Sequence, residues 1–401
     1  MYVLVVDDDK IWYYLGGINN MKNEVGIVKI KWIEFENLDT GLKIERINFY
    51  DDMTLLVGIS GAGKTQILKA IEYSIRFALG EMNIFSPYSV CIGVNIDGHL
   101  YEWSYKLKKQ EETDEISFEN DDEYYFAYES LICDQKMLFL RDGDLIKIEG
   151  FADIPTPKKD KSLIYQYSDD LHFNELVSGL KKLYNIDIEY DVRRYLRRDS
   201  VNQLKVRINK TFKEKPDASF ESFSHLPSLA KLYIVRNHYK EEFDKILCSV
   251  QGIFPEIEDI DFVEEPNSDW YCVQIVVYGK KIYQDDISNG MLKTIFFIIE
   301  LYTATNQSLI MIDEFENGLG INCIDAISEL LIGERNDLQF IITSHHPKII
   351  GNIDYNCWRI IEREKNIVKN FDCHDEGYEI GGNHHDAYYN LLNKWEFEGK
   401  I

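Results

Sequence analysis

The stretch LLVGISGAGKT, residues 55–65, decides the fold of this 401-residue chain. An apolar run of strand length leads into the pattern G-x-x-x-x-G-K-[ST], and helical periodicity follows, which is the context that a phosphate-binding loop requires. The backbone N–H groups of such a loop surround a phosphate at a helix N-terminus, and here they belong to Ser60, Gly61, Ala62, Gly63 and Lys64. Lys64 would reach the β- and γ-phosphates of ATP, and the Thr65 hydroxyl would bind Mg²⁺. A glycine-rich turn that binds no nucleotide is the alternative.

The segment SLIMIDEFENGLG, residues 308–320, is a second candidate part of the site. An apolar strand that ends at Asp313 fits a carboxylate that holds Mg²⁺ through water. Glu314 beside it fits a base that polarises an attacking water. A buried strand that ends in Asp-Glu is a weak signal alone, but together with the glycine loop it predicts a nucleotide-hydrolysing site.

Two histidines follow a later apolar strand in IITSHHP, residues 341–347. Ligands of open α/β sheets bind beyond the carboxyl ends of the strands, which is where His345 and His346 lie. One of them is predicted to donate a hydrogen bond to the γ-phosphate. We prefer His345 to His346 for this role.

The stretch DDISNGMLKT, residues 285–294, opens an apolar helix that is predicted to reach about Thr303. Ser288 is well placed to be the N-cap of this helix.

Strand-rich and helical parts alternate along the chain. Strand patterns precede the glycine loop from residue 25 and return over 89–150 as short strands, with hairpin signals at Asp97-Gly98 and Asp142-Gly143. From 253 strands and helices alternate, which favours a parallel, covered sheet. We predict an α/β fold with four segments: an N-terminal extension over 1–24, a lobe with the phosphate loop over 25–155, an inserted helical lobe over 156–252 and a second lobe over 253–401.

The charge of the chain argues against general binding to nucleic acid. It has 44 basic and 69 acidic residues, a net charge of −25. The segment 191–215 is the exception, with nine basic and three acidic residues and thus a net charge of +6. The seven cysteines show no Cys-x-x-Cys spacing. The sequence also shows no signal peptide and no apolar run of about 18 residues. Together these features predict a cytoplasmic protein with no membrane partner.

The order of the motifs resembles that of ABC-type ATPases: a glycine loop, an inserted region, Ser-x-Gly opening a helix, Asp-Glu, and a strand-end histidine. Residues 287–291 look like a degenerate form of the signature motif of that family. The resemblance implies a P-loop head with a mixed sheet and an antiparallel lobe. It also implies that Ser288, Asn289 and Gly290 contact the γ-phosphate bound by a partner subunit. ATP would then lie between two heads in a homodimer or a higher homo-oligomer.

Further roles follow only from this resemblance. The loop 316–320 would cross the interface between the heads. The glutamine that senses Mg²⁺ in the family could be Gln135 or Gln166. The signature lacks its usual second glycine and its glutamine, which leaves open whether turnover is fast or slow.

The tail of the chain is similar to that of stand-alone ATPases of the OLD-like group in bacterial anti-phage defence, such as the AriA subunit of PARIS or the PtuA subunit of Septu. OLD nucleases carry a Toprim domain after the ATPase, but only 54 residues follow Pro347 here. The resemblance therefore implies a sensor or scaffold that controls a separate effector, a nuclease or toxin, when a phage component triggers it.

Four features of the sequence allow other interpretations. An SMC-like ATPase that clamps DNA would use the basic stretch Arg193–Lys215. A GTPase lacks support, because no Asn-Lys-x-Asp pattern is suitably placed. The opening YVLVVDDDK resembles the start of a receiver domain, but a glycine loop stands where the phosphoacceptor would be. A zinc site in the tail would draw on residues whose spacing fits no known pattern: Cys373, His374, His384, His385 and Asp386.

Overall fold

The computed structural model describes residues 27–110, 124–151, 156–168, 170–185, 195–215, 218, 220–223, 226–333, 337–375, 378 and 384–397. The predicted extension over 1–24, Arg193 and Arg194 lie outside the described residues. The chain forms two compact units, which are described separately. The larger unit is built from Val25–Asn185, Asn306–Phe315 and Asn336–Ile401, and the smaller one from Ile186–Thr305 and Glu316–Arg335.

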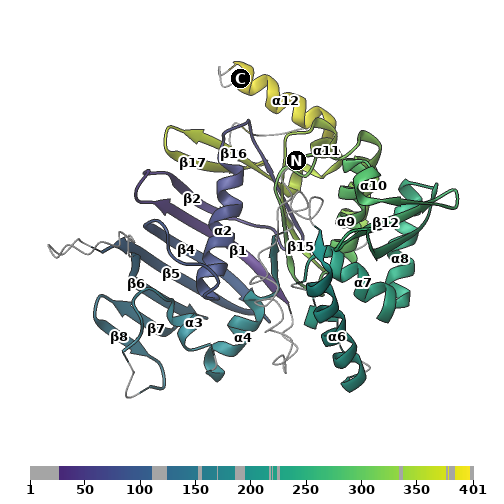
Figure 1. Ribbon diagram of the computed structural model, residues 1–401. Coiled ribbons are helices and arrows are strands. Elements are labelled where there is room, and N and C mark those ends of the chain that lie inside the picture. Colours follow the sequence, from purple (N-terminus) through teal and green to yellow (C-terminus); the bar gives the residue numbers. More distant parts are fainter. Residues whose placement is uncertain are drawn as a thin grey trace, which may run out of the picture. The chain divides into compact units, whose positions relative to one another are not determined.

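The larger unit contains, within its described residues, a 13-stranded mixed sheet (Figure 1). Its spatial order is β8 (Leu145–Ile148), β7 (Lys136–Asp142), β6 (Tyr124–Cys133), β5 (His99–Lys109), β4 (Tyr88–Ile96), β1 (Val28–Asn37), β2 (Lys43–Asn48), β17 (Ile367–Asp372), β16 (Trp358–Glu364), β3 (Met53–Val57), β15 (Gln339–Ser344), β14 (Leu309–Ile312) and β9 (Leu183–Asn185). The strands from β8 to β2 pair antiparallel, whereas β16, β3, β15, β14 and β9 are mutually parallel.

Helix α2 (Lys64–Ala78) follows the glycine loop and covers one face of this sheet, packing on β1, β4 and β15 (Figure 1). The helical periodicity that follows the glycine loop in the sequence is confirmed, because Ile67, Leu68, Ile71 and Ile75 are buried in the main hydrophobic core. The helix stops just before Gly80, which has φ +70° and whose N–H donates to the carbonyl of Phe77. Strand β3, which leads into the glycine loop, thus pairs with β15 and β16 and packs on the core under α2.

The antiparallel half of the sheet confirms both predicted hairpins. Asp97 and Gly98 form the turn between β4 and β5, each with positive φ. Between β7 and β8 the two turn residues are Gly143 and Asp144, one position later than the predicted pair. These strands are longer than expected, because β5 and β6 have 11 and 10 residues.

The other helices of the larger unit are short or peripheral to the glycine loop. They are α3 (Leu163–Gln166), α4 (Leu171–Leu180), α11 (Pro347–Asn352), the 3-10 turn η4 (Tyr355–Cys357) and α12 (His384–Phe397). Helices α3 and α4 and strand β9 belong to this unit, so the predicted boundary after residue 155 falls inside it. Periodicity alone did not reveal this, since β9 has three residues and too few to show a pattern.

The smaller unit combines helices with a 4-stranded antiparallel sheet, counted over its described residues. Its elements are β10 (Leu196–Arg197), α6 (Arg198–Glu214), η2 (Phe220–Phe223), α7 (Ser228–His238), α8 (Lys240–Ile253), β11 (Ile257–Glu264), β12 (Trp270–Val277), β13 (Lys280–Tyr283), η3 (Gln284–Asp286), α9 (Asn289–Thr303) and α10 (Ile321–Gly333). The prediction of a parallel sheet for the whole region after 253 is therefore wrong for β11–β13. Gly279, with φ +68°, lies in the tight turn between β12 and β13 and makes them an antiparallel hairpin.

One buried side chain ties the parallel strands to the antiparallel half. The Gln339 amide accepts from the backbone N–H of Ile30 (2.8 Å) and donates to the carbonyls of Ile30 (2.9 Å) and Tyr50 (2.7 Å). Gln339 is fully buried. Its side chain supplies hydrogen-bond partners to the N–H and carbonyl of Ile30 in β1 and to the carbonyl of Tyr50 in the loop before β3.

We expect Gln339→Leu to lower the free energy of unfolding by about 3 kcal/mol, because it leaves buried backbone groups without hydrogen-bond partners. Chemical denaturation would measure the loss. Gln203→Leu, at an exposed position of α6, is the control and should stay within about 0.5 kcal/mol of wild type. Equal stability of the two variants would contradict the role of Gln339.

Candidate functional site

The glycine loop connects β3 to α2, as the motif predicts. Gly61 and Gly63 have φ +80° and +106°, a region in which other residues are strained. A Cβ on Gly58 would lie 2.5 Å from the carbonyl oxygen of Ile361, and one on Gly63 would lie 2.7 Å from Cγ2 of Val368. The loop therefore lies directly against β16 and β17, and glycine is required for this contact at both positions.

Lys64 is the first residue of α2 and is 5% exposed. Its Nζ donates to the carbonyl oxygens of Gly58 (2.7 Å) and Ile59 (3.1 Å) and lies 3.4 Å from Nδ1 of His345. The ammonium group is thus enclosed by the loop itself. Gly63 precedes the helix in a left-handed conformation and makes no side-chain cap, so the first turn of α2 is not capped by its own N-cap residue.

Hydroxyl and carboxylate groups from three elements meet at Asp313. The Thr65 hydroxyl donates to Asp313 Oδ1 (3.2 Å), and the Thr343 hydroxyl donates to the same oxygen (2.6 Å). β3, β15 and β14 are neighbouring parallel strands, so their carboxyl ends meet at one edge of the sheet. The Asp313 carboxylate is exposed, whereas Thr343 is fully buried.

Thr343 also fixes the position of Glu314. The Thr343 hydroxyl oxygen accepts from the backbone N–H of Glu314 (2.7 Å), and the Thr343 carbonyl accepts from that of Phe315 (3.0 Å). Glu314 has φ +45°, which is strained for a glutamate. Thr343 was missed by sequence reasoning, because a threonine inside an apolar strand looks like an ordinary β-branched strand residue.

The two histidines have different surroundings. His346 is the N-cap of α11, and its Nδ1 accepts from the backbone N–H of Lys348 (3.3 Å). His345 faces the glycine loop through its contact with Lys64. The choice of His345 as the residue near a bound phosphate stays a prediction.

These residues fit a nucleotide and its magnesium ion. The loop presents backbone at Gly61 and Gly63 with no side chain to fill the space, and a buried ammonium group lies beside it. The hydroxyl of Thr65 and the exposed carboxylate of Asp313 are oxygen donors of the type that Mg²⁺ prefers. Lys64, Thr65, Asp313, Glu314 and His345, all predicted from sequence, lie in one compact unit.

The residues around Ser288 lie in the smaller unit and form their own cluster. The Ser288 hydroxyl accepts from the backbone N–H of Met291 (3.3 Å) and so is the N-cap of α9. Lys293, on the next turn, donates to the carbonyl of Asn317 (2.8 Å). A Cβ on Gly290 would lie 3.2 Å from the carbonyl oxygen of Gly318. The start of α9 is therefore packed on the loop that follows Glu314 in the chain.

Comparison with known proteins identifies the fold. Residues 160–351 match a family model described as "AAA domain, putative AbiEii toxin, Type IV TA system". The Smc head bound to the C-terminal winged-helix domain of ScpA aligns with a TM-score of 0.50 and 14% identity, over 85% of this chain and 96% of that one. The chain has the fold of an ABC-type P-loop ATPase head.

Two further solved head domains align with this chain. The Smc head domain with an extended coiled coil bound to the C-terminal domain of ScpA, from Pyrococcus furiosus, aligns with a TM-score of 0.49 and 12% identity over 92% of this chain and 100% of that one. The SMC head domain from Thermotoga maritima has a TM-score of 0.42 and 12% identity over 86% of this chain and 98% of that one. No curated protein matches the sequence.

Both candidate glutamines of the ABC-type head are described. Gln135 lies in the turn between β6 and β7 with φ +70°. The Gln166 amide accepts from the N–H of Lys158 (2.7 Å) and donates to the carbonyls of Lys158 and Lys161, so it organises its own loop. No described contact links either glutamine to the glycine loop, and the choice between them stays a prediction.

The tail does not support the zinc site that was weighed for it. Cys373 and His374 lie together beside Asp372, but the carboxylate of Asp372 accepts from Arg359 (2.6 Å) and from the Tyr50 hydroxyl (2.6 Å). A cation would compete there with the Arg359 guanidinium. The side chains of His384 and His385 lie outside the described residues. In the part of the chain that is described, no helix is both long and apolar enough to cross a bilayer.

We expect Gly63→Ala to abolish nucleotide binding. The added Cβ would force the loop away from Val368, and alanine cannot adopt φ +106° without strain. Gly143→Ala is the control, since Gly143 also has positive φ (+59°) but lies in the turn between β7 and β8, outside the loop, where a Cβ would meet no atom within 4 Å. It should cost only about 1 kcal/mol of stability and retain binding of a fluorescent ATP analogue. Equal binding by both variants would contradict the packing argument.

Proposed function

We propose that the protein binds and hydrolyses ATP and that ATP brings two heads together. The observation that carries this proposal is the convergence of Lys64, Thr65, Asp313, Thr343 and His345 at the carboxyl ends of adjacent strands. The fold of an ABC-type head supports the same conclusion. The match of residues 160–351 to an AAA-domain family covers Ser288, Glu314 and His345.

The residues divide the work as follows. Lys64 exchanges the carbonyls of Gly58 and Ile59 for phosphate oxygens when ATP binds. Thr65 and Asp313 hold Mg²⁺, which supplies charge neutralisation at the phosphates. Glu314 polarises the attacking water, and His345 donates a hydrogen bond to the γ-phosphate as charge develops. Thr343 positions both acids, since its hydroxyl contacts the Asp313 carboxylate and the Glu314 backbone.

We expect Thr343→Val to lower the rate of ATP hydrolysis about 10- to 100-fold while ATP affinity changes little. Valine has the same shape but cannot hold Asp313 or the N–H of Glu314. Thr343→Ser keeps the hydroxyl and should restore most of the rate. A loss of activity in the serine variant as large as in the valine variant would show that packing, not the hydroxyl, matters.

The second side of the ATP site comes from a partner copy in this proposal. Ser288, Asn289 and Gly290 open α9, whose N-terminal N–H groups suit a γ-phosphate. The loop 316–320 is held against this helix start by Lys293 and by the close approach at Gly290. The two segments that would reach across the interface thus form a single rigid patch.

Glu314→Gln should bind ATP and remain a dimer, because hydrolysis no longer releases the γ-phosphate. Size-exclusion chromatography with light scattering would show the dimer with ATP and not without it. Adding Ser288→Arg to this variant should abolish the dimer but retain ATP binding, whereas Lys64→Ala should lose both. An ATP-independent monomer for Glu314→Gln would contradict the dimer.

We infer further that the ATPase is a sensor or scaffold of the OLD-like defence group and controls a separate effector. The family description, which speaks of a putative toxin and a type IV toxin–antitoxin system, supports a setting of this kind. The net charge of −25 favours protein partners over a nucleic-acid track. Affinity purification of Glu314→Gln with ATP from the native host should retain a second protein, and Lys64→Ala should release it.

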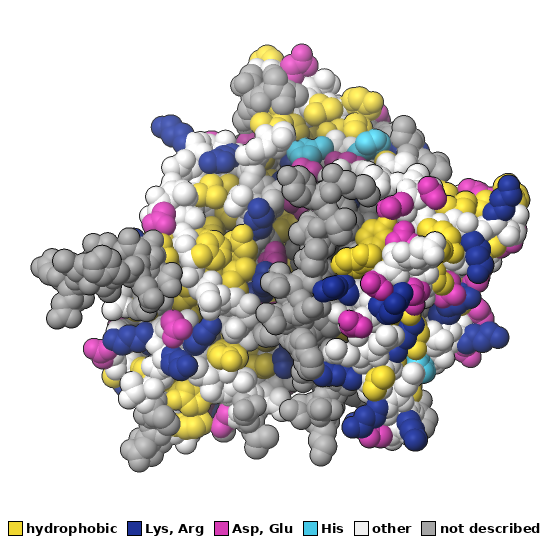
Figure 2. Space-filling view, in the orientation of Figure 1, with side chains coloured by type: hydrophobic (Ala, Val, Ile, Leu, Met, Phe, Trp, Pro, Cys, Tyr) yellow, Lys and Arg dark blue, Asp and Glu magenta, His cyan; other side chains and the backbone are white. Residues whose placement is uncertain are grey.

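The alternative, an SMC-like DNA clamp, is weakened by the contacts of the basic segment. Arg198 pairs with Glu264 and with Asp269, and Lys205 lies over the rings of Tyr233 and Tyr271. In Figure 2, the Lys and Arg side chains around the place that α6 has in Figure 1 lie among Asp and Glu side chains. A salt-dependent affinity for duplex DNA that falls on Arg207→Glu and Lys210→Glu would favour the clamp instead.

A further inference from the structure

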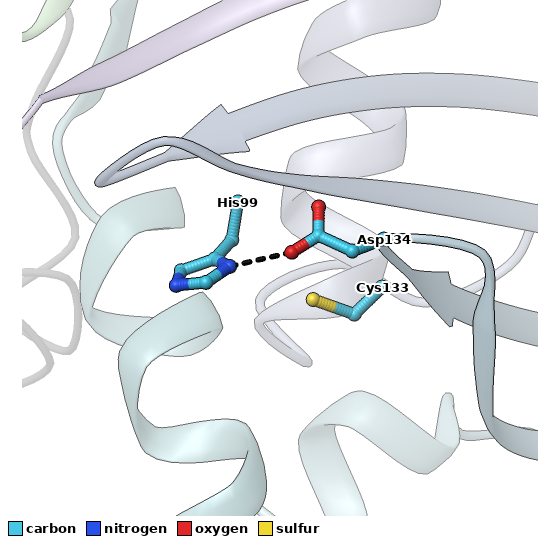
Figure 3. Close-up of side chains that lie close together, drawn as sticks. All are labelled: His99, Cys133 and Asp134. Atoms are coloured by element: carbon cyan, nitrogen blue, oxygen red, sulfur yellow. Dashed lines mark hydrogen bonds and ion pairs between the residues drawn. The ribbon is translucent and has the colours of Figure 1, made fainter.

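Three metal-binding side chains of different chemistry converge at one end of the antiparallel half of the sheet. His99 is the first residue of β5, Cys133 is the last residue of β6, and Asp134 begins the turn between β6 and β7 (Figure 3). The ligand atoms of the three residues all lie within 4.8 Å of one another. This cluster is part of the larger unit and none of its members belongs to the candidate ATP site.

The backbone holds the cluster in place. Asp134 has φ +47°, and its N–H donates to the carbonyl of Leu100 (3.0 Å). The Leu100 N–H in turn donates to Asp134 Oδ1 (2.9 Å). Two neighbouring turns are thus joined by a reciprocal pair of hydrogen bonds, and the positions of His99 and Asp134 are set by the sheet rather than by flexible loops.

The side chains point to a shared space. His99 Nδ1 lies 2.6 Å from Asp134 Oδ2, and their side chains are 55% and 50% exposed. Figure 3 shows the Cys133 thiol on the same side of the imidazole, with the other ring nitrogen pointing away from both residues. Because that second nitrogen faces away from the thiol, the arrangement does not suit a histidine base that activates a cysteine nucleophile.

The charges around the cluster favour a cation. Three acidic groups act electrostatically on His99: Asp134, Glu175 of α4 and Asp97. The imidazole of His99 and the carboxylate of Asp134 already form a close pair, and a divalent ion would add positive charge among these acidic groups.

We propose that His99 Nδ1, Cys133 Sγ and Asp134 Oδ2 bind Zn²⁺ and thereby fasten the two turns together. Nitrogen, sulfur and carboxylate oxygen are the zinc ligand set, and tetrahedral zinc places its ligand atoms about 3.3–3.8 Å apart. The His99–Asp134 pair would open by under about 1 Å to reach that spacing, which rotation of two half-exposed side chains provides. Metal binding releases the protons of the imidazole and the thiol to solvent.

The test uses full-length protein that has been stripped of metal with a chelator, without nucleotide. Zn²⁺ should bind with one equivalent in competition with a chromophoric chelator, and Co²⁺ should give a thiolate-to-metal charge-transfer absorption. Cys133→Ser should abolish the absorption and weaken Zn²⁺ binding at least about 100-fold, and His99→Gln should weaken binding at least about tenfold. Circular dichroism would establish that both variants fold.

Cys373→Ser is the matched control. Cys373 also has an aspartate and a histidine next to it, but Arg359 occupies that aspartate. This variant should bind Zn²⁺ as wild type does. Failure of the wild-type protein to take up Zn²⁺, or unchanged uptake by folded Cys133→Ser, would overturn the proposal.

Discussion

The hydroxyl of Thr343 is the group on which the geometry of the candidate site depends. It donates to the Asp313 carboxylate and accepts from the backbone N–H of Glu314, so one buried side chain fixes an acid on each of two consecutive positions. Both bonds exist because β14 and β15 are parallel neighbours that end together, and β3 next to them brings the glycine loop to the same edge. Glu314 could not otherwise hold a left-handed backbone at an exposed position without cost. The strand order therefore brings these groups together at one edge of the sheet, and the hydrophobic core under α2 stabilises that sheet.

In the smaller unit, a close backbone approach at Gly290 holds two candidate segments together, where Thr343 does so in the larger unit. The start of α9 approaches the loop 316–320 closely enough that Gly290 allows no larger side chain without movement, and Lys293 ties the same loop by its carbonyl. The loop follows Glu314 by only a few residues. In the proposed dimer, this helix start and this loop form the surface that would meet the partner's phosphate.

Sequence predicted the elements whose signals are local. The glycine loop, the helix after it, and the strands that end just before Asp313 and His345 all appear where the motifs place them. The choice of His345 over His346 stays a prediction, although Pro347 at the first position of a helix is a local signal for His346 as the N-cap. What could not be read depends on contacts between distant segments. Gln339 bonds to β1 more than 300 residues away, Thr343 acts on the next strand, β9 is too short to show periodicity, and β11 to β13 form a sheet of their own.

Complementation between two inactive variants tests the central claim, that each ATP is held by two copies of the chain. Lys64→Ala removes the phosphate loop of its own site, and Ser288→Arg blocks the site that it offers to its partner. Each alone should hydrolyse no ATP. Because neither variant pairs with itself, the dimers in an equal mixture are mixed and each has one intact site out of two, so the rate should recover to at most about half of wild type. No recovery, in a mixture whose mixed dimers are confirmed by two different affinity tags, would contradict the account.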